Sequence, residues 1–555
     1  MSTTAQFQTL FKTLGFHNLS TEQETAIIDE ILKQNSKSGN VNAMPNLNLK
    51  DAISQAGKGT FSNGEEQPRY TIGGNVAPGW EPVRKAFESN FQKGLERNSQ
   101  CCIFHKGNLV VDIYGTNQVA TMNTGPPRGY NSDTVQIVFS STKALASVCM
   151  AVCADRGWLN YDDKVSKHWP EFAQNGKENL TIADILRHDG GMHELKETVT
   201  YEDMFDQKNR KGRLSTILAR QTPFRWSSGP DKGKIPRLYH GLSRGLILNQ
   251  ITIRADPKGR TIGEILHEEV SSKLNAQAYC GRHPFGWEKE VSIGILQGPP
   301  KGWRFANLMV PPIVRKHMAA ASTTEKKPLS KTGKSRMEFF NSDASKEHPS
   351  LNPSNKSINT MSLDQKKVYE IHGKTWEWEK VKDGFFYTQS PGSMNYDSPS
   401  ASGRASAKGL AKVMSAMSMA CNNTNGSEII SHEGAIRAIG NPVQNAARGN
   451  EALVNPFWLG VVGDTAFTNC GLDNHCEKFG FKDRRHVLER LYGKNVYGWG
   501  GFGGSSLWFN PHDNIGFAYT VTGGNDGVAN GDAERTNPIY LAIRQSVNNL
   551  TSAKL

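Results

Sequence analysis

Several features that would assign a chain to a common class of protein are missing from these 555 residues. No run of about 18 apolar residues occurs, so a membrane-spanning helix is not expected. The eight cysteines contain no CxxC pair, and histidine and cysteine never cluster at ligand spacing, so we expect neither a metal site nor a cofactor. The formal net charge is +12, but the lysine and arginine residues do not form a basic stripe with interleaved aromatic residues. This argues against a nucleic-acid-binding surface.

The first 16 residues also lack the hydrophobic core of a signal peptide. They are poor in acidic residues and carry hydroxyl groups but no arginine, so a mitochondrial presequence is a weaker alternative to a cytoplasmic protein. Scattered cysteines that look unpaired fit a reducing compartment. We therefore expect the chain to be cytoplasmic.

Composition divides the chain into an extension and one large domain. Residues 1–69 read as a loosely helical N-terminal extension followed by a linker rich in Asn, Ser, Gly and Lys. A compact domain is expected over residues 70–555. Within it, residues of about 316–374 are rich in Ser, Lys, Asn and Pro, and we interpret them as a polar insertion, partly disordered.

Hairpin patterns occur near both ends of the domain. Cys101–His105 and Leu109–Tyr114 flank one turn, while Ser506–Phe509 and Gly516–Val521 flank another, with a helix expected over Asp532–Leu550. This mirrored arrangement predicts an α+β fold in which both termini build one antiparallel sheet between helices, an α/β/α sandwich. The middle of the chain would then form an inserted helical lobe.

The most informative motif is Ser140-Ser141-Thr142-Lys143, which follows a short apolar run and opens an apolar helix over Ala144–Asp155. Residues i and i+3 share one face of a helix, so Lys143 is expected beside the Ser140 hydroxyl. A desolvated lysine favours its neutral, basic form and could accept the hydroxyl proton. A four-residue pattern with two fixed positions also arises by chance, so its context decides between the two interpretations.

Further segments supply that context, because the chain from about residue 70 to its C-terminus, the polar insertion apart, resembles the serine β-lactamase-like hydrolases. This superfamily includes class C β-lactamases, DD-peptidases and related carboxylesterases. The segments that carry the resemblance, besides Ser-x-x-Lys, are Val111–Gly115, Gly157–Leu159, Asp162–Val165 and Leu180–His188.

The resemblance implies a site of three motifs. The first is Ser140 as nucleophile with Lys143. The second is Tyr239-His240-Gly241, in which Tyr239, as phenol or phenolate, would pass protons with Lys143, and Gly241 stands where asparagine is common. The third is Trp499-Gly500-Gly501, which is similar to the Trp-x-Gly version of the carboxylesterases. Phe502 would share the oxyanion hole with Ser140 through its backbone amide.

The resemblance also implies the fold and activity: a five-stranded antiparallel sheet with a helical lobe, and hydrolysis through an acyl-enzyme. Trp499 removes the cation that would pair with a substrate carboxylate, which favours a small neutral ester or amide over β-lactams and D-Ala-D-Ala peptides. A carboxylesterase is therefore favoured over a β-lactamase or DD-peptidase. The alternative is a catalytically silent scaffold for binding or assembly, which the changes at Gly241 and Trp499 would fit.

Two other patterns imitate functional motifs. Lys331-Thr332-Gly333 spells the third motif of the β-lactamases but lies in the polar insertion, without a strand around it. Gly241-Leu242-Ser243-Arg244-Gly245 spells the elbow of the α/β-hydrolases, which requires a preceding central strand. Pro236 makes that strand a poor one. We interpret both patterns as coincidences, and His188 and His193 as structural residues of a loop.

Overall fold

The computed structural model describes residues 58–60, 66–68, 70–117, 129–193, 195–197, 199–225, 232–281, 397–423, 428–440, 465–478, 493–522 and 533–552. Within these ranges, no helix is both long enough and apolar enough to cross a membrane. Most of residues 1–69 and the whole of the polar insertion lie outside them. Inside the expected linker, β1 (Lys58–Thr60) and β2 (Glu66–Pro68) pair with each other.

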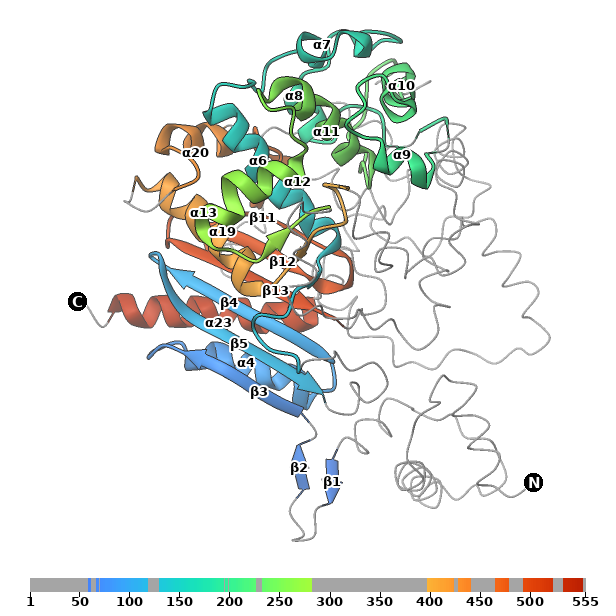
Figure 1. The fold of residues 1–555 in the computed structure, drawn as a ribbon. Coiled ribbons are helices and arrows are strands. Elements are labelled where there is room, and N and C mark those ends of the chain that lie inside the picture. Colours follow the sequence, from blue (N-terminus) through green and yellow to red (C-terminus); the bar gives the residue numbers. More distant parts are fainter. Residues whose placement is uncertain are drawn as a thin grey trace, which may run out of the picture.

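One antiparallel sheet is built from both ends of the chain (Figure 1). β4 of the first hairpin pairs along its length with β13 of the last, from Ser99 opposite Val521 to His105 opposite Ile515. The strand order is β3-β5-β4-β13-β12-β11-β10-β9. The strands are β3 (Tyr70–Val76), β4 (Asn98–His105), β5 (Asn108–Asn117), β9 (Thr465–Phe467), β10 (Asp473–Lys478), β11 (Tyr497–Gly500), β12 (Ser506–Asn510) and β13 (Ile515–Val521).

The expected α+β architecture is confirmed, but the sheet of the described residues has eight strands where five were expected. The extra strands lie toward the edges, where the alternating pattern that reveals a strand is weak. β3 contains Gly73 and Gly74, and β9 has only three residues. A separate small sheet joins β6 (Gln136–Ile137), β8 (Arg404–Ala405) and β7 (Ala278–Tyr279).

Helices cover both faces of the main sheet. On one face, α4 (Glu81–Gln92) and α23 (Ala533–Ser552) pack together over a core that includes Phe87, Trp508 and Tyr519 (Figure 1). On the other face, α19 (Ala407–Cys421) lies against β4, β12 and β13. Beyond it the helical lobe contains the α-helices α6 (Thr142–Asp155), α7 (Val165–His168), α8 (Ile182–Leu186), α9 (Tyr201–Phe205), α10 (Arg213–Arg220), α11 (Ser243–Ala255), α12 (Ile262–Ile265), α13 (Ser272–Leu274) and α20 (His432–Ile439). It also contains two short 3-10 helices, η1 (Phe139–Ser141) and η2 (Pro170–Phe172), and a π-helix, η3 (Leu266–Ser271).

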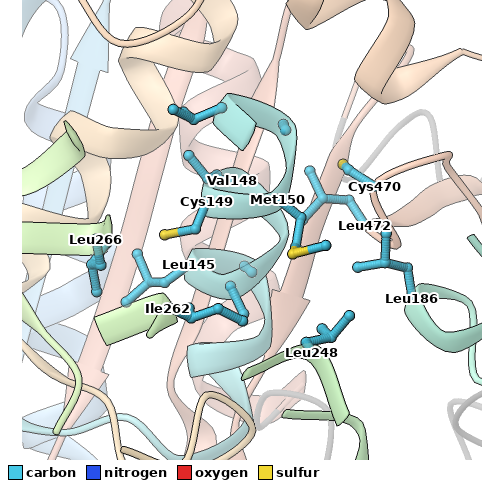
Figure 2. Packing of buried hydrophobic residues seen from close by; sticks show 14 of the residues in the cluster. Leu145, Val148, Cys149, Met150, Leu186, Leu248, Ile262, Leu266, Cys470 and Leu472 are labelled. Carbon is cyan, nitrogen blue, oxygen red and sulfur yellow. The ribbon is translucent and has the colours of Figure 1, made fainter. Parts of the chain in front are cut away.

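The helix α6 is the centre of the second core. Every residue from Thr142 to Ala154 is buried, as the apolar sequence of this helix predicts. Figure 2 shows Leu145, Val148, Cys149 and Met150 of α6 surrounded by side chains from other elements: Leu186, Leu248, Ile262, Leu266, Cys470 and Leu472. Such dense packing fixes the start of α6, where the Ser-x-x-Lys motif lies.

Candidate active site

The Ser-x-x-Lys motif spans the junction between η1 and α6. Phe139, immediately before Ser140, has a φ of 45°, which is a left-handed conformation that costs energy for a bulky residue. The Thr142 hydroxyl stabilises this turn, because it donates to the Phe139 carbonyl and accepts the Gly403 amide at 2.9 Å. The bend leaves Ser140 partly exposed, while Ser141 and Lys143 are buried.

The Lys143 amine is fully buried and contacts three oxygen atoms. Its Nζ lies 3.3 Å from Ser140 Oγ, 2.8 Å from the Gly241 carbonyl and 2.9 Å from the Ser400 carbonyl. No carboxylate pairs with it in the part of the chain that the structure describes. Burial, with a smaller contribution from the positive charge of Arg244, holds the pKa of Lys143 well below its usual range.

These contacts define how a neutral Lys143 would be oriented. A neutral amine has two N–H groups and one lone pair. The two carbonyl oxygens, of Gly241 and Ser400, can accept both N–H groups. The lone pair is then left for the third neighbour, the Ser140 hydroxyl. This arrangement suits an acceptor for the serine proton.

Tyr239, which is 99 positions from Ser140 in the sequence, is brought onto the serine by the loop before α11. Its hydroxyl lies 2.5 Å from Ser140 Oγ, and Lys143 Nζ lies 4.7 Å from the centre of its ring. Burial raises the pKa of Tyr239 to about 12, although the hydrogen bond with Ser140 and the charge of Arg244 act in the opposite direction. At neutral pH this tyrosine is therefore a phenol and not a phenolate.

The third motif lies at the end of β11, beside η1. Gly501 has no room for a side chain, since a Cβ there would lie 2.2 Å from both the Val138 carbonyl and Ser505 Oγ. Its glycine allows the strand to approach the nucleophile turn. A hydroxyl chain joins the two segments: Ser505 Oγ donates to the Val138 carbonyl at 2.8 Å and contacts Ser141 Oγ at 3.0 Å.

After Gly501, the chain turns through η11 (Phe502–Gly504), in which Gly503 and Gly504 have positive φ angles. The Gly503 carbonyl accepts a hydrogen bond of 2.8 Å from Arg535 of α23. Arg535 is buried and forms an ion pair of 3.2 Å with Glu96, which also accepts the Tyr519 hydroxyl. The turn that carries the Phe502 amide is thus held from behind by a buried ion pair.

Trp499 is buried within a group of aromatic rings and does not point freely into solvent. Its ring stacks with Phe467 at 5.4 Å, with His188 at 5.6 Å and with Tyr239 at 6.3 Å between centroids. His188 also accepts the His240 amide at Nδ1, which places its proton on Nε2. Burial lowers the pKa of His188 well below its usual value, so this ring is neutral.

Ser243 of the α/β-hydrolase-like pattern does not have the environment of a nucleophile. It is fully buried at the start of α11, and its hydroxyl donates to the Met192 carbonyl at 2.6 Å. Lys331-Thr332-Gly333 lies outside the described residues. Within those residues, no group of three His, Cys, Asp or Glu side chains could hold a metal ion.

The structure brings together Ser140, Lys143 and Tyr239, with Trp499, Gly500, Gly501 and the Phe502 turn next to them. Sequence reasoning did not identify two further contributors, the Ser400 carbonyl and Arg244. A backbone carbonyl has no signature in a sequence, and Arg244 lay inside a pattern set aside as a coincidence. His188, interpreted as a structural residue of a loop, lies directly against Tyr239 and Trp499.

Comparison with known proteins identifies the family to which this chain belongs. The model of the Beta-lactamase family matches residues 87–539. The chain is 27% identical to the Esterase/beta-lactamase LipL of Mycobacterium tuberculosis over 212 residues, which are 38% of this chain and 45% of that protein. It is 28% identical to Protein flp of Staphylococcus aureus over 136 residues, or 24% and 26% of the two chains. The chain therefore aligns with less than half the length of either relative.

Solved structures resemble the fold. A family VIII carboxylesterase has a TM-score of 0.57 at 22% identity, covering 86% of this chain and all of its own. A penicillin-binding protein homologue from Caulobacter crescentus has a TM-score of 0.55 at 21% identity, with the same coverage. EstA from Arthrobacter nitroguajacolicus has a TM-score of 0.56 at 18% identity, covering 86% and 98%. At these identities the likeness concerns the fold alone.

Proposed function

The chain belongs to the Beta-lactamase family, whose superfamily consists of serine hydrolases. From this premise we propose that it hydrolyses small neutral esters or amides through an acyl-enzyme on Ser140. One observation carries the proposal. Ser140 Oγ lies 2.5 Å from the Tyr239 hydroxyl and 3.3 Å from the buried Lys143 amine, which has no carboxylate partner within the described residues.

In the first step, Ser140 Oγ forms a bond to the acyl carbon while its proton passes to Lys143 Nζ. The electron pair of the carbonyl moves onto its oxygen, beside the backbone amides of Ser140 and Phe502. Collapse of this intermediate breaks the bond to the leaving alcohol or amine. The proton then travels from Lys143 through the Tyr239 phenol to the leaving group.

Water repeats the sequence in the second half of the reaction. It gives a proton to the Tyr239 and Lys143 pair, attacks the acyl carbon and releases the acid, and Ser140 regains its proton. Tyr239 serves as a relay because it is a phenol at neutral pH and can both donate and accept. Lys143 is the base because burial favours its neutral form.

The substrate class follows from Trp499. An indole is uncharged and cannot form an ion pair with a substrate carboxylate. The neighbouring rings of Phe467 and His188 carry no charge either. We therefore expect a neutral ester, such as that of a carboxylesterase substrate, to be preferred over β-lactams and D-amino-acid peptides. A small molecule of this kind is the expected partner. The silent-scaffold alternative is disfavoured because Ser140, Lys143 and Tyr239 are present and in contact.

The test is fluorophosphonate labelling with peptide mapping, alongside hydrolysis of p-nitrophenyl butyrate, in the wild type, Ser140→Ala and Ser243→Ala. We expect label and turnover to disappear only in Ser140→Ala. Loss only in Ser243→Ala would point to the α/β-hydrolase pattern. Absence of label in all three would support a silent scaffold. Stoichiometric acylation by benzylpenicillin would return the substrate class to β-lactams and D-peptides.

A further inference from the structure

Arg244 is a buried cation directly behind the Ser-x-x-Lys motif. Its side chain is fully buried, and its guanidinium donates to three neutral oxygens. These are the Leu186 carbonyl at 3.0 Å, Ser147 Oγ at 2.9 Å and the Lys143 carbonyl at 3.4 Å. Two of these three partners lie on α6, so the positive charge is fixed against the helix that presents Lys143.

Three other buried arginines of the described residues have carboxylate partners. Arg237, Arg260 and Arg535 each form an ion pair, with Asp189, Asp256 and Glu96 respectively. Within the described residues, no carboxylate pairs with Arg244. A buried charge without a counter-ion is costly to stability. A neutral side chain could also donate hydrogen bonds to these oxygens. The hydrogen bonds therefore do not explain why position 244 carries a permanently charged residue.

We propose that Arg244 is a positioning residue of the hydrolase reaction, and that its guanidinium adds to burial in keeping the Lys143 amine neutral so that the amine can accept the Ser140 proton. This inference rests on the proposed function. Arg244 does not touch the reacting atoms. It acts through Lys143, because a second positive charge on the lysine would be repelled by the guanidinium in a site that water does not screen.

The groups around Lys143 leave Arg244 as the source of this repulsion. Tyr239, His188 and His240 face the lysine from neighbouring loops, and burial favours the neutral form of each. Arg237 acts on His188 but is paired with Asp189. Cys470 faces Arg244, and burial raises its pKa, so this thiol is neutral too.

The charge of Arg244 is permanent under the conditions of the reaction. Burial lowers the pKa of Arg244 to about 10, which still leaves it protonated at neutral pH. It adds to burial in lowering the pKa of Lys143. Removing the charge should therefore raise the pH at which Lys143 loses its proton, by about one unit for a like charge nearby.

The experiment measures kcat/KM for p-nitrophenyl butyrate, and the rate of fluorophosphonate labelling, as functions of pH in the wild type, Arg244→Met, Arg244→Lys and Ser147→Ala. The acid limb of these profiles reports the proton on the free enzyme's base. In Arg244→Met we expect this limb to move about one unit to higher pH, so that rates on the limb fall about tenfold and recover in more alkaline buffer.

The two controls separate charge from structure. Arg244→Lys keeps a cation and should hold the limb near its wild-type position. Ser147→Ala removes a hydrogen-bond partner of the guanidinium but not its charge, so its limb should not move. An unmoved limb in Arg244→Met, with rates reduced equally at every pH, would assign Arg244 a purely structural role and overturn the proposal.

A second measurement covers the case in which Arg244→Met does not fold. The Cε resonance of Lys143 can be titrated by NMR in the wild type with 13C-labelled lysine and assigned with Lys143→Met. In Arg244→Gln, which keeps hydrogen-bond donors but loses the charge, the midpoint of this titration should lie about one unit above that of the wild type, and equal midpoints in the two proteins would overturn the inference. The proposed function fails separately, by absence of label on Ser140 in the wild type.

Discussion

Two buried cation sites, one on each face of the main sheet, differ in their partners. On the face covered by α4 and α23, Arg535 is paired with Glu96 and holds the Gly503 carbonyl. On the other face, the helical lobe also contains a paired cation, Arg260, but Lys143 and Arg244 are buried there without a carboxylate partner among the described residues. A paired charge contributes a fixed position, whereas an unpaired one costs stability and changes the protonation of its neighbours. The paired cation Arg535 holds the turn that follows the third motif, whereas Lys143 lies beside the Ser140 hydroxyl.

Replacing Lys143 tests the unpaired side of this comparison most severely. In Lys143→Met we expect kcat to fall by about a thousandfold or more, because the proton acceptor is lost. The protein should remain folded, since an apolar side chain of similar length replaces a buried amine. Turnover of p-nitrophenyl butyrate and circular dichroism measure the two effects. Full activity in this variant would remove Lys143 from the mechanism.

The same variant gives a pH signature in stability. The pKa of Lys143 is lower in the folded protein than in the unfolded chain, so the unfolded chain binds more protons in the window between the two values. The wild type should therefore gain free energy of unfolding as the pH rises through that window. Lys143→Met lacks this slope, and its advantage over the wild type should be largest at low pH. Urea unfolding at several pH values measures the difference.

The variant Arg535→Met tests the paired site, because it leaves the Glu96 carboxylate buried without its cation. We expect a loss of about 3–5 kcal/mol in the free energy of unfolding. Glu96→Gln should be costly for the same reason, while the double variant should recover part of the loss. Urea unfolding of all four proteins forms a double-mutant cycle. Purely additive losses would contradict the description of this pair as one unit.

Tyr239→Phe removes the relay but leaves the base. We expect kcat to fall by about a hundredfold, within the usual range for general acid–base groups. In the wild type, the high pKa of Tyr239 means that its ionisation should not limit activity until the pH approaches about 12. The alkaline side of the wild-type profile should therefore stay flat up to the pH at which the protein unfolds. A decline near pH 7 to 8 that disappears in Tyr239→Phe would show that the phenol ionises there, and would contradict its raised pKa.

Ser505→Ala is expected to have the smallest effect. It removes the hydrogen bond to the Val138 carbonyl and the contact with Ser141, which together join the nucleophile turn to the turn after β11. One neutral hydrogen bond corresponds to about 1 kcal/mol, or a rate loss of about fivefold in kcat. Stability should change by a similar amount. A loss as large as that of Tyr239→Phe would place Ser505 in the proton path instead.

Much of the fold could be read from local patterns. The two hairpins, the terminal helix and the apolar α6 lie within a few residues of their expected bounds. Alternating residues in strands and the helical period are local signals, and long elements express them clearly. The edge strands β3 and β9, and β10 next to β9, were missed because they are short, irregular or interrupted by glycine. The division into an extension and a domain from residue 70 stays a prediction, as does the cytoplasmic location.

The sequence by itself determined that Ser140 and Lys143 share a helix face, since a spacing of three residues ensures it. Only the tertiary structure decided what surrounds them. Tyr239 lies 99 positions away, and the Ser400 carbonyl lies 257 positions from Lys143. Whether Arg244 has a counter-ion depends likewise on the packing of α11 against α6. Such contacts form between segments that are distant in the sequence, and they depend on burial and on backbone atoms. A local pattern of side chains reveals neither the burial nor the backbone contacts.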